Sequence, residues 1–291
     1  MIKNFFCSVL ILALPAAVCS GGEKVLLQYR HDVGLTLNYK MNVDGTIVFK
    51  QLGGWVKGEK DSPKTISMKK ELYSSAEVVS RSNGRMNVVY RFDKGFSEKT
   101  KGRNVKKTDL DFKGEDIRIK MWPDGKTEIE NIGALEKVYR KSQTPYLEEP
   151  LLTILPKKRL KIGATWKQKF TRQGLFIEGE PISYTVRYKL AEIEEYKGVR
   201  CAVIEGRAKL GLKNYQGKTR KGKKVDVLKA EEKMDSVMYF DIERGTPIET
   251  RKTIKRHETR EWEAKGDKEP YRDELDTEVT IKAVLVGSEQ K

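Results

Sequence analysis

Cysteine and histidine are scarce in this sequence, with three and two copies respectively among 291 residues. Cys7 and Cys19 fall within the first 20 residues, so Cys201 has no partner for a disulfide in the remainder of the chain. His31 and His257 have no second histidine or cysteine at the spacing of a zinc site. We therefore expect no metal and no cofactor, a small buried hydrophobic role for Cys201, and a turn position for His31.

The short motifs of common enzyme classes are also missing. There is no GxSxG elbow, no Walker loop and no GxGxxG after a strand. Two carboxylate pairs at i and i+2 remain, Asp109 with Asp111 and Glu192 with Glu194. Carboxylate pairs of this kind can perform acid–base chemistry or bind calcium. Pairs beside so many lysines are usually solvated instead. We predict that the protein is not an enzyme, with a hydrolase using Asp109 and Asp111 as the minor alternative.

Acidic residues are the minority charge, at 42 against 58 lysines and arginines, which gives a net charge of +16. The excess gathers in two segments that we expect to be loops, 94–107 and 213–224. Their candidate residues for an anionic partner are Lys99, Lys101, Arg103, Lys106, Lys107, Lys218, Arg220, Lys221, Lys223 and Lys224. Few aromatic residues lie nearby for base stacking, so we expect no nucleic acid. The expected partner is an anionic membrane surface or an anionic envelope polymer, and solvated hairpin tips are the alternative.

Long apolar runs are absent except at the N-terminus. There Lys3 precedes an apolar stretch over 5–18 and small residues up to Ser20, which indicates a secretory signal peptide over 1–20 that is too short to span a membrane. The run 16–22 resembles a bacterial lipoprotein signal, in which Cys19 is lipidated. Ordinary cleavage after Cys19 or Ser20 is the alternative. We expect export to the periplasm or outer membrane, with or without a lipid anchor.

From Lys24 onward the dominant hydrophobic period is two, which is typical of half-buried strands. The clearest run alternates from Leu35 to Val43. Glycine-containing pairs predict the turns between strands, and these are Asp44–Gly45, Asn83–Gly84, Asp124–Gly125, Lys197–Gly198 and Arg244–Gly245. Helical spacing occurs only over 134–140. The alternating charged run 256–261 around His257 is interpreted as a solvated strand edge.

Three prolines interrupt the middle of the chain, at Pro145, Pro150 and Pro156. Prolines at this spacing exclude a long helix, so we predict an irregular connector over 145–164 that ends in a turn at Gly163. It separates an N-terminal half, 24–144, from a C-terminal half, 165–287. We predict an all-β, mainly antiparallel fold with two curved meander sheets or half-barrels, one short helix and a structural duplication without a sequence repeat.

Three segments carry a resemblance to known proteins: LPKKRLKIGATW from Leu155, EEYKGVRCAVIEG from Glu194 and MYFDIERGTPIETRKT from Met238. Together with the strand pattern, they resemble bacterial exported domains of unknown function that are distantly similar to the LolA/LolB and LppX-like envelope proteins. The resemblance covers about 24–286 and is best over 163–253. It implies half-barrel sheets and no shared catalytic residues.

A curved sheet with one short helix leaves its concave side incompletely filled. An apolar concavity in an envelope protein suits a lipid-like ligand, and Trp166, Tyr184 and Tyr188 are the candidate lining residues. We predict a non-enzymatic exported envelope protein that binds an apolar or amphiphilic ligand or an anionic envelope component. The alternative is a structural or partner-binding scaffold whose two sheets close on each other without a cavity. The oligomeric state stays open.

Overall fold

The computed structural model describes residues 23–52, 63–131, 133–134, 137–138, 153–172, 178–179, 181–218, 223–263 and 271–290. The signal peptide with Cys19, the first part of the connector (145–152), and Arg220 and Lys221 lie outside the described residues. The helix expected over 134–140 also falls largely outside them. Within the described residues, no helix is long and apolar enough to cross a membrane.

Strands dominate the described chain, and the predicted all-β, antiparallel class is confirmed. The strands are β1 (Lys24–Val25), β2 (Leu35–Gln51), β3 (Lys64–Ser82), β4 (Arg85–Lys101), β5 (Asn104–Asp111), β6 (Asp116–Met121), β7 (Thr127–Ile129), β8 (Leu160–Lys161), β9 (Thr165–Arg172), β10 (Glu178–Gly179), β11 (Ile182–Tyr196), β12 (Val199–Lys218), β13 (Lys224–Asp241), β14 (Thr246–Trp262) and β15 (Tyr271–Gln290).

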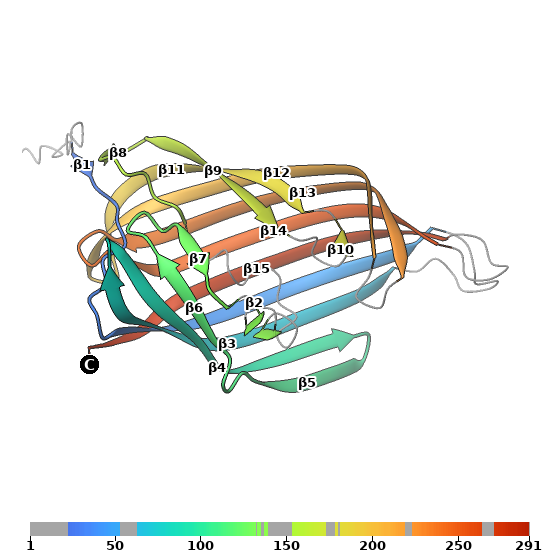
Figure 1. The fold of residues 1–291 in the computed structure, drawn as a ribbon. Helices are drawn as coiled ribbons and strands as arrows, with labels where there is room; N and C mark the ends of the chain where they lie inside the picture. The colour runs from blue at the N-terminus through green and yellow to red at the C-terminus, as the bar shows by residue number, and fades with distance from the viewer. Residues whose placement is uncertain are drawn as a thin grey trace, which may run out of the picture.

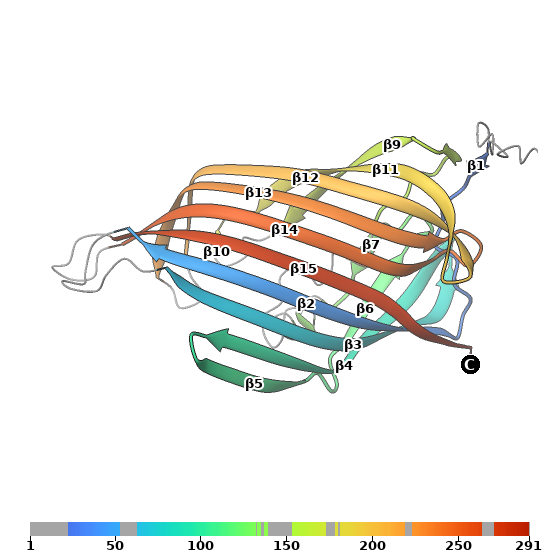
Figure 2. The ribbon, with the colours of Figure 1, turned by 180° about the vertical axis from the view of Figure 1, so that it is seen from behind.

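Thirteen of these strands form one sheet in the order β7-β6-β4-β3-β2-β15-β14-β13-β12-β11-β9, with β5 beside β4 and β10 beside β12. The sheet consists of two meanders, which the antiparallel pairing of β2 with β15 joins at its centre. Both lateral edges curl toward the same side, so the sheet forms a long trough (Figures 1 and 2). The edge strands β7 and β9 do not pair with each other. The predicted bounds of the two halves and the duplication stay predictions.

Alternation of side chains explains why these segments are strands. In β2 the side chains of Leu37, Tyr39, Met41 and Val43 are buried, and the intervening residues are more exposed. Alternate residues of a strand point to opposite faces, so one side of the sheet is apolar. Four predicted turns are confirmed, and their glycines have positive φ values: Gly84 72°, Gly125 82°, Gly198 76° and Gly245 66°.

The turn predicted at Asp44–Gly45 is wrong, because β2 runs through it without interruption. Gly45 pairs with Met68 on β3 and with Val279 on β15. A Cβ at this position would lie 3.3 Å from Met68 Cε and 3.4 Å from Val279 Cγ2. Glycine therefore serves close packing across the neighbouring strands here, rather than a change of direction.

The two basic segments are also not the loops that the charge pattern predicted. β4 extends to Lys101 and β5 begins at Asn104, so 94–107 is a tight two-stranded hairpin with Gly102 and Arg103 in its turn. Likewise β12 continues to Lys218 and β13 begins at Lys224. Lysines are compatible with exposed strand positions, where they also hinder pairing with foreign strands, so a charged run alone does not indicate a loop.

One end of the trough is closed by the segment 25–31, which enters the main hydrophobic core. Val25, Leu27 and Tyr29 are buried in alternation. The Tyr29 ring lies edge-on to Phe240 at 5.4 Å, and its backbone N–H donates to the Pro123 carbonyl at 2.8 Å. The segment therefore ties the β6–β7 turn to the end of β13.

The described part of the connector spans the two open edges of the sheet at the same end. We call residues 153–157 the strap. On one side, Leu155 N–H donates to the Asp124 carbonyl in the β6–β7 turn at 2.7 Å. On the other, Ile154 N–H donates to Gln168 Oε1 at 3.0 Å, and Trp166 Nε1 donates to the Ile154 carbonyl at 3.0 Å, both on β9. The strap thus links edges that no strand pairing joins.

His31 lies between β1 and β2, shortly before the turn of Val33 and Gly34, and it is buried. It is 4% exposed, and its Nδ1 lies 3.3 Å from Thr246 Oγ1. Burial lowers the pKa of His31 from 6.5 to about 4, with Arg81 acting in the same direction and the Arg30 backbone and Asp32 opposing it. The folded chain therefore holds this imidazole neutral at pH values where the unfolded chain protonates it.

This difference predicts an acid-sensitive fold. Between pH 6.5 and 4 the unfolded state binds a proton at His31 that the folded state does not, so the free energy of unfolding decreases as the pH falls. The loss is on the order of 2 kcal/mol at pH 5. Urea denaturation from pH 7 to pH 5 should show it, and His31→Gln should flatten the dependence. His257→Gln is the control, because His257 is exposed. An unchanged pH dependence in His31→Gln would contradict this assignment.

Candidate functional site

The concave side of the trough, here called the inner face, is the candidate site. Cross-strand pairing places Val186, Ala208, Met234, Ile254 and Val279 side by side on β11, β12, β13, β14 and β15. All five side chains are buried. The apolar surface therefore continues across five strands, which is the extended apolar lining that ligand pockets use.

Aromatic side chains form one wall of this face, at the β9 edge. Trp166 stacks on Tyr188 with ring centroids 5.5 Å apart, and Phe170 stacks on Tyr184 at 5.5 Å. Tyr188 lies over Gly206 of β12, where a Cβ would come within 2.8 Å of the tyrosine ring. The three residues predicted to line a ligand site, Trp166, Tyr184 and Tyr188, thus lie together on one wall. That they bind a ligand stays a prediction.

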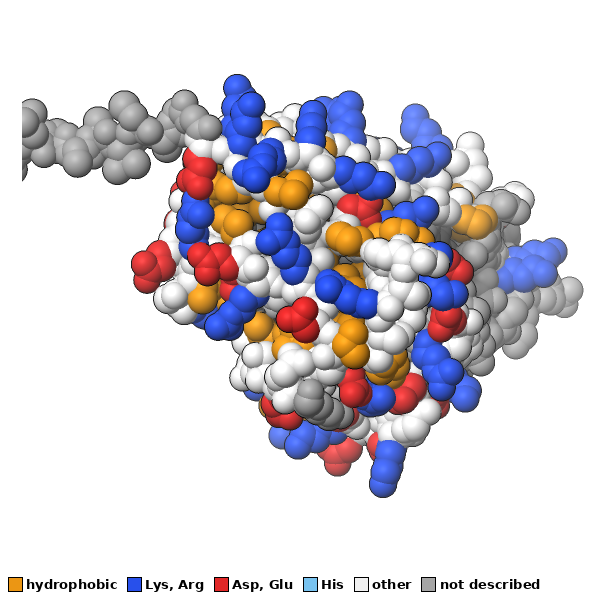
Figure 3. All heavy atoms as spheres, turned by 60° about the vertical axis from the view of Figure 1, so that its left-hand side comes forward, with side chains coloured by type: hydrophobic (Ala, Val, Ile, Leu, Met, Phe, Trp, Pro, Cys, Tyr) orange, Lys and Arg blue, Asp and Glu red, His pale blue; other side chains and the backbone are white. Residues whose placement is uncertain are grey.

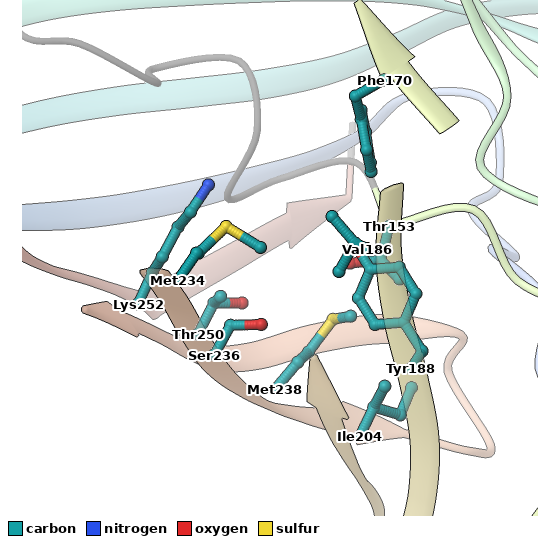
Figure 4. Close-up of a pocket in the computed structure, with 10 residues that line it drawn as sticks. All are labelled: Thr153, Phe170, Val186, Tyr188, Ile204, Met234, Ser236, Met238, Thr250 and Lys252. Atoms are coloured by element: carbon teal, nitrogen blue, oxygen red, sulfur yellow. The ribbon is translucent and has the colours of Figure 1, made fainter. Parts of the chain in front are cut away.

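A cavity of about 20 Å³ lies between this wall and β13–β14. In Figure 4, Met234, Met238 and Lys252 face Phe170, Val186 and Tyr188 across it. A space of this volume holds about one water molecule. This cavity is therefore too small for an acyl chain unless the wall moves.

A polar stripe runs along β14 through the apolar surface. Lys252, Arg256, Glu258 and Arg260 occupy alternate inner positions, and each is less than 10% exposed. β14 pairs with β13 on one side and with β15 on the other, so it is a central strand. The prediction of a solvated edge over 256–261 is therefore wrong, although His257 itself is exposed on the outer face.

The buried charges of this stripe are neutralised across strands. Asp273 of β15 accepts hydrogen bonds from Arg260 Nε at 2.7 Å, Arg260 Nη2 at 3.0 Å and Trp262 Nε1 at 2.6 Å. Arg256 Nε donates to Glu258 at 2.8 Å, and Arg256 Nη1 lies 3.5 Å from Glu232 Oε2 on β13. Charges removed from water need such partners, so the network fixes β13, β14 and β15 in register.

The other candidate residues are mostly on the surface. Lys99, Lys101, Arg103, Lys106 and Lys107 are exposed on the β4–β5 hairpin. Lys218, Lys223 and Lys224 are exposed in the described part of the other basic segment, 213–224. Figure 3 shows lysine and arginine side chains over much of one face, with hydrophobic side chains between them. Asp109 and Asp111 are exposed on β5, and Asp111 accepts a hydrogen bond from Lys113 N–H at 2.9 Å.

Cys201 is fully buried, as its apolar neighbours predicted. Burial raises the pKa of the Cys201 thiol to about 11, with smaller contributions from Asp241 and Glu194. A thiol of this kind is not ionised near neutral pH and is a poor nucleophile.

The outer face of the sheet has a shallow groove of about 410 Å³ over β13, β14, β15 and β2. Its charged side chains pair with one another: Lys255 Nζ lies 3.0 Å from Glu278, and His257 Nδ1 lies 2.8 Å from Asp276. Since these charges already satisfy each other at the surface, the groove offers a partner little electrostatic gain.

Comparisons with known proteins give a distant likeness of fold. No family model and no curated protein matches the sequence. A structure of lipovitellin, described by its lipid–protein interactions, is similar over 89% of this chain with 10% identity and a TM-score of 0.47, and the similarity spans 26% of the lipovitellin chain. An outer membrane channel from Pseudomonas putida matches over 88% of this chain and 97% of its own, with 7% identity and a TM-score of 0.24.

A DUF1329 family protein from Desulfovibrio piger matches over 87% of this chain and 85% of its own, with 8% identity and a TM-score of 0.17. These scores are too low to support a functional conclusion.

Proposed function

We propose that this protein is a non-enzymatic protein of the cell envelope that binds an amphiphilic, lipid-like ligand on its inner face. The observation that carries the proposal is the apolar surface shared by five strands, bordered by the Trp166–Tyr188 wall. Buried lysines within this surface, Lys70 and Lys252, provide positive charge next to apolar side chains. An amphiphile needs both features. The envelope location rests on the sequence pattern of the first 20 residues.

Ligand entry requires the trough to widen, since the present cavity holds about one water molecule. The architecture permits this without loss of strand pairing, because β7 and β9 are not bonded to each other. Three hydrogen bonds between the strap and Asp124, Gln168 and Trp166 hold the two edges at the closed end. Each contributes about 1 kcal/mol, so a ligand that buries apolar surface can offset their loss.

A scaffold without a ligand is the second candidate function. The small volume of the cavity favours it. The two candidates differ in one observable: a carrier binds added amphiphile at an apolar site, and a scaffold does not.

An amphiphile-binding measurement tests the proposal. We expect the purified protein to carry lipid in native mass spectrometry, or to bind an environment-sensitive apolar dye that fatty acid displaces. Tyr188→Glu places a charge on the aromatic wall and should reduce binding at least tenfold, because a carboxylate is costly to bury. Thr185→Glu makes the same change of charge on the exposed face of β11 and should have little effect.

Ser236→Leu is a second variant, for the case that Tyr188→Glu fails to fold. Ser236 lines the cavity between Met234 and Met238, and leucine fills that space with an apolar group. We expect weaker binding with the fold retained. A clean apo mass, with no displaceable dye in the wild-type protein, would contradict the carrier and favour the scaffold.

A further inference from the structure

β3, β4 and β5 form one border of the sheet, here called the β3–β4–β5 border, and their pairing determines which charged side chains lie on the same face. On the inner face, β3 presents Lys70, β4 presents Lys99 and Lys101, and β5 presents Lys106. We call these four residues the lysine face. The remaining inner positions of the same stretch are apolar or neutral except for Lys64: Ile66, Met68, Leu72, Gly95, Ser97, Asn104, Thr108 and Leu110. No carboxylate occurs on the inner side of 64–72, 95–101 and 104–111.

All carboxylates of these stretches lie on the outer face. Glu98 pairs across the strands with Lys107 and Lys69, and the Lys107 Nζ–Glu98 distance is 3.5 Å. Glu71 forms an ion pair with Lys40, with Oε2 and Nζ 2.8 Å apart. Asp109 and Asp111 follow on the same face of β5. The outer side of these three stretches is therefore internally neutralised, whereas their inner side has cations alone.

This arrangement brings like charges close together. Lys99 and Lys106 are directly opposite each other in the antiparallel pair, where like charges repel. Among the described residues, neither forms an ion pair. Burial, with the neighbouring Lys99 acting in the same direction, lowers the pKa of Lys70 to about 8. An anion that contacts several of these ammonium groups would relieve their repulsion.

The lysine face adjoins the apolar part of the trough. Lys70 lies in one cross-strand row with Val43, Ile281 and Lys252, all on the inner face. Met68 and Leu72 flank Lys70 on β3. An acyl chain on the apolar rows would therefore place its head at the β3–β4–β5 border, where Figure 1 shows the hairpin forming one side of the trough.

We infer that the ligand carries a phosphate head and that the lysine face binds it, so that the preferred amphiphile is an anionic phospholipid. Lysine ammonium groups act as point charges for phosphate oxygens, and several of them around one head match its charge better than a single cation does. This inference rests on the proposed function, because it names the class of amphiphile for the same inner face.

The test compares two lipids with identical acyl chains, phosphatidylglycerol and phosphatidylcholine, in a dye-displacement assay at fixed ionic strength. We expect the wild-type protein to prefer phosphatidylglycerol by about thirtyfold, as two lysines near an anionic head provide. Lys99→Gln with Lys106→Gln should remove most of this preference and leave phosphatidylcholine binding unchanged. These lysines are exposed, so folding should not be affected.

The matched control is Lys94→Gln with Lys107→Gln, which removes two charges from the outer face of the same hairpin. This variant should keep the preference. An equal loss in both double variants would overturn the lysine face and indicate general attraction by the basic surface. Competition by inorganic phosphate at the concentration of the lipid would likewise overturn it, since the site would then bind free anions.

The outcomes separate this inference from the function on which it rests. Equal binding of the two lipids by the wild-type protein would refute the preference for a net anionic head and retain the carrier. Binding of neither lipid would refute the carrier itself.

Discussion

Asp273→Ala is expected to destabilise the protein by about 3–5 kcal/mol, which is the usual result of removing one partner from a buried ion pair. Asp273 is 0% exposed and accepts three hydrogen bonds, two from Arg260 and one from Trp262. Its loss leaves the Arg260 guanidinium buried without its main counter-charge. The free energy of unfolding from urea denaturation at pH 7 is the measurement.

Two further variants isolate the cause of this effect. Asp276→Asn changes an exposed carboxylate of the same strand and should leave the denaturation midpoint within error. Arg260→Met combined with Asp273→Leu removes both charges and should recover most of the lost stability, since an apolar pair avoids the desolvation of the ions. A double variant as unstable as Asp273→Ala alone would show that cavity formation, rather than an unpaired charge, is responsible.

Tyr29→Ala is expected to cost about 3–5 kcal/mol, as for other large buried aromatic residues. Tyr29 is 2% exposed, contacts Phe240 and donates a hydrogen bond from its hydroxyl to the Thr153 carbonyl of the strap at 3.1 Å. The substitution therefore opens a cavity at the point where segment 25–31, the strap and β13 meet. Thermal and urea denaturation should both report the loss.

The hydroxyl and the ring contribute separately. Tyr29→Phe keeps the ring and should lose about 1 kcal/mol, the usual net value of one hydrogen bond. Arg30→Ala changes the exposed neighbour, whose contact with the Gly245 carbonyl is through its backbone N–H, and should be close to neutral. Equal effects of Tyr29→Ala and Arg30→Ala would contradict a closed end organised by the Tyr29 ring.

Much of the strand content could be predicted from local sequence. Alternation from Leu35 to Val43 identified a face that is buried as expected, and Asn83–Gly84 and Lys197–Gly198 marked turns whose residues have positive φ values. These features depend only on nearest neighbours along the chain. The face that a strand buries and the sign of φ at its turn both depend on local sequence. They can therefore be predicted from one sequence.

Pairing between distant strands could not be predicted in this way. Gly45 has the local signal of a hairpin turn, and only the approach of Met68 and Val279 explains why the strand continues. The charges at Arg256 and Arg260 suggested solvent, because their partners Glu232 on β13 and Asp273 on β15 belong to other strands. Charge patterns predict exposure only where no counter-charge lies across the sheet.

The candidate site was predictable in part. Trp166, Tyr184 and Tyr188 were predicted to line a ligand site, and the structure brings them onto one wall, although their binding role stays a prediction. Lys99, Lys101 and Lys106 were predicted as candidates for an anionic partner, but the face that they share with Lys70 was missed because the segment 94–107 was interpreted as a loop. Continued alternation through this segment would have separated Lys99, Lys101 and Lys106 from Glu98 and Asp109. The strap lies in the connector that the prolines predicted, but its hydrogen-bond partners could not be predicted.

The pairing of β2 with β15 has a consequence for how the chain reaches its native state. Most neighbours in the sheet are also neighbours in sequence and can form as local hairpins, whereas Leu35 must find Gln290. Closing so long a loop carries a large entropic cost and raises the contact order, which slows folding. The central ladder is thus expected to form last. Until it does, two long strands in the middle of the future sheet each present an unpaired edge, and aggregation competes with folding during that interval.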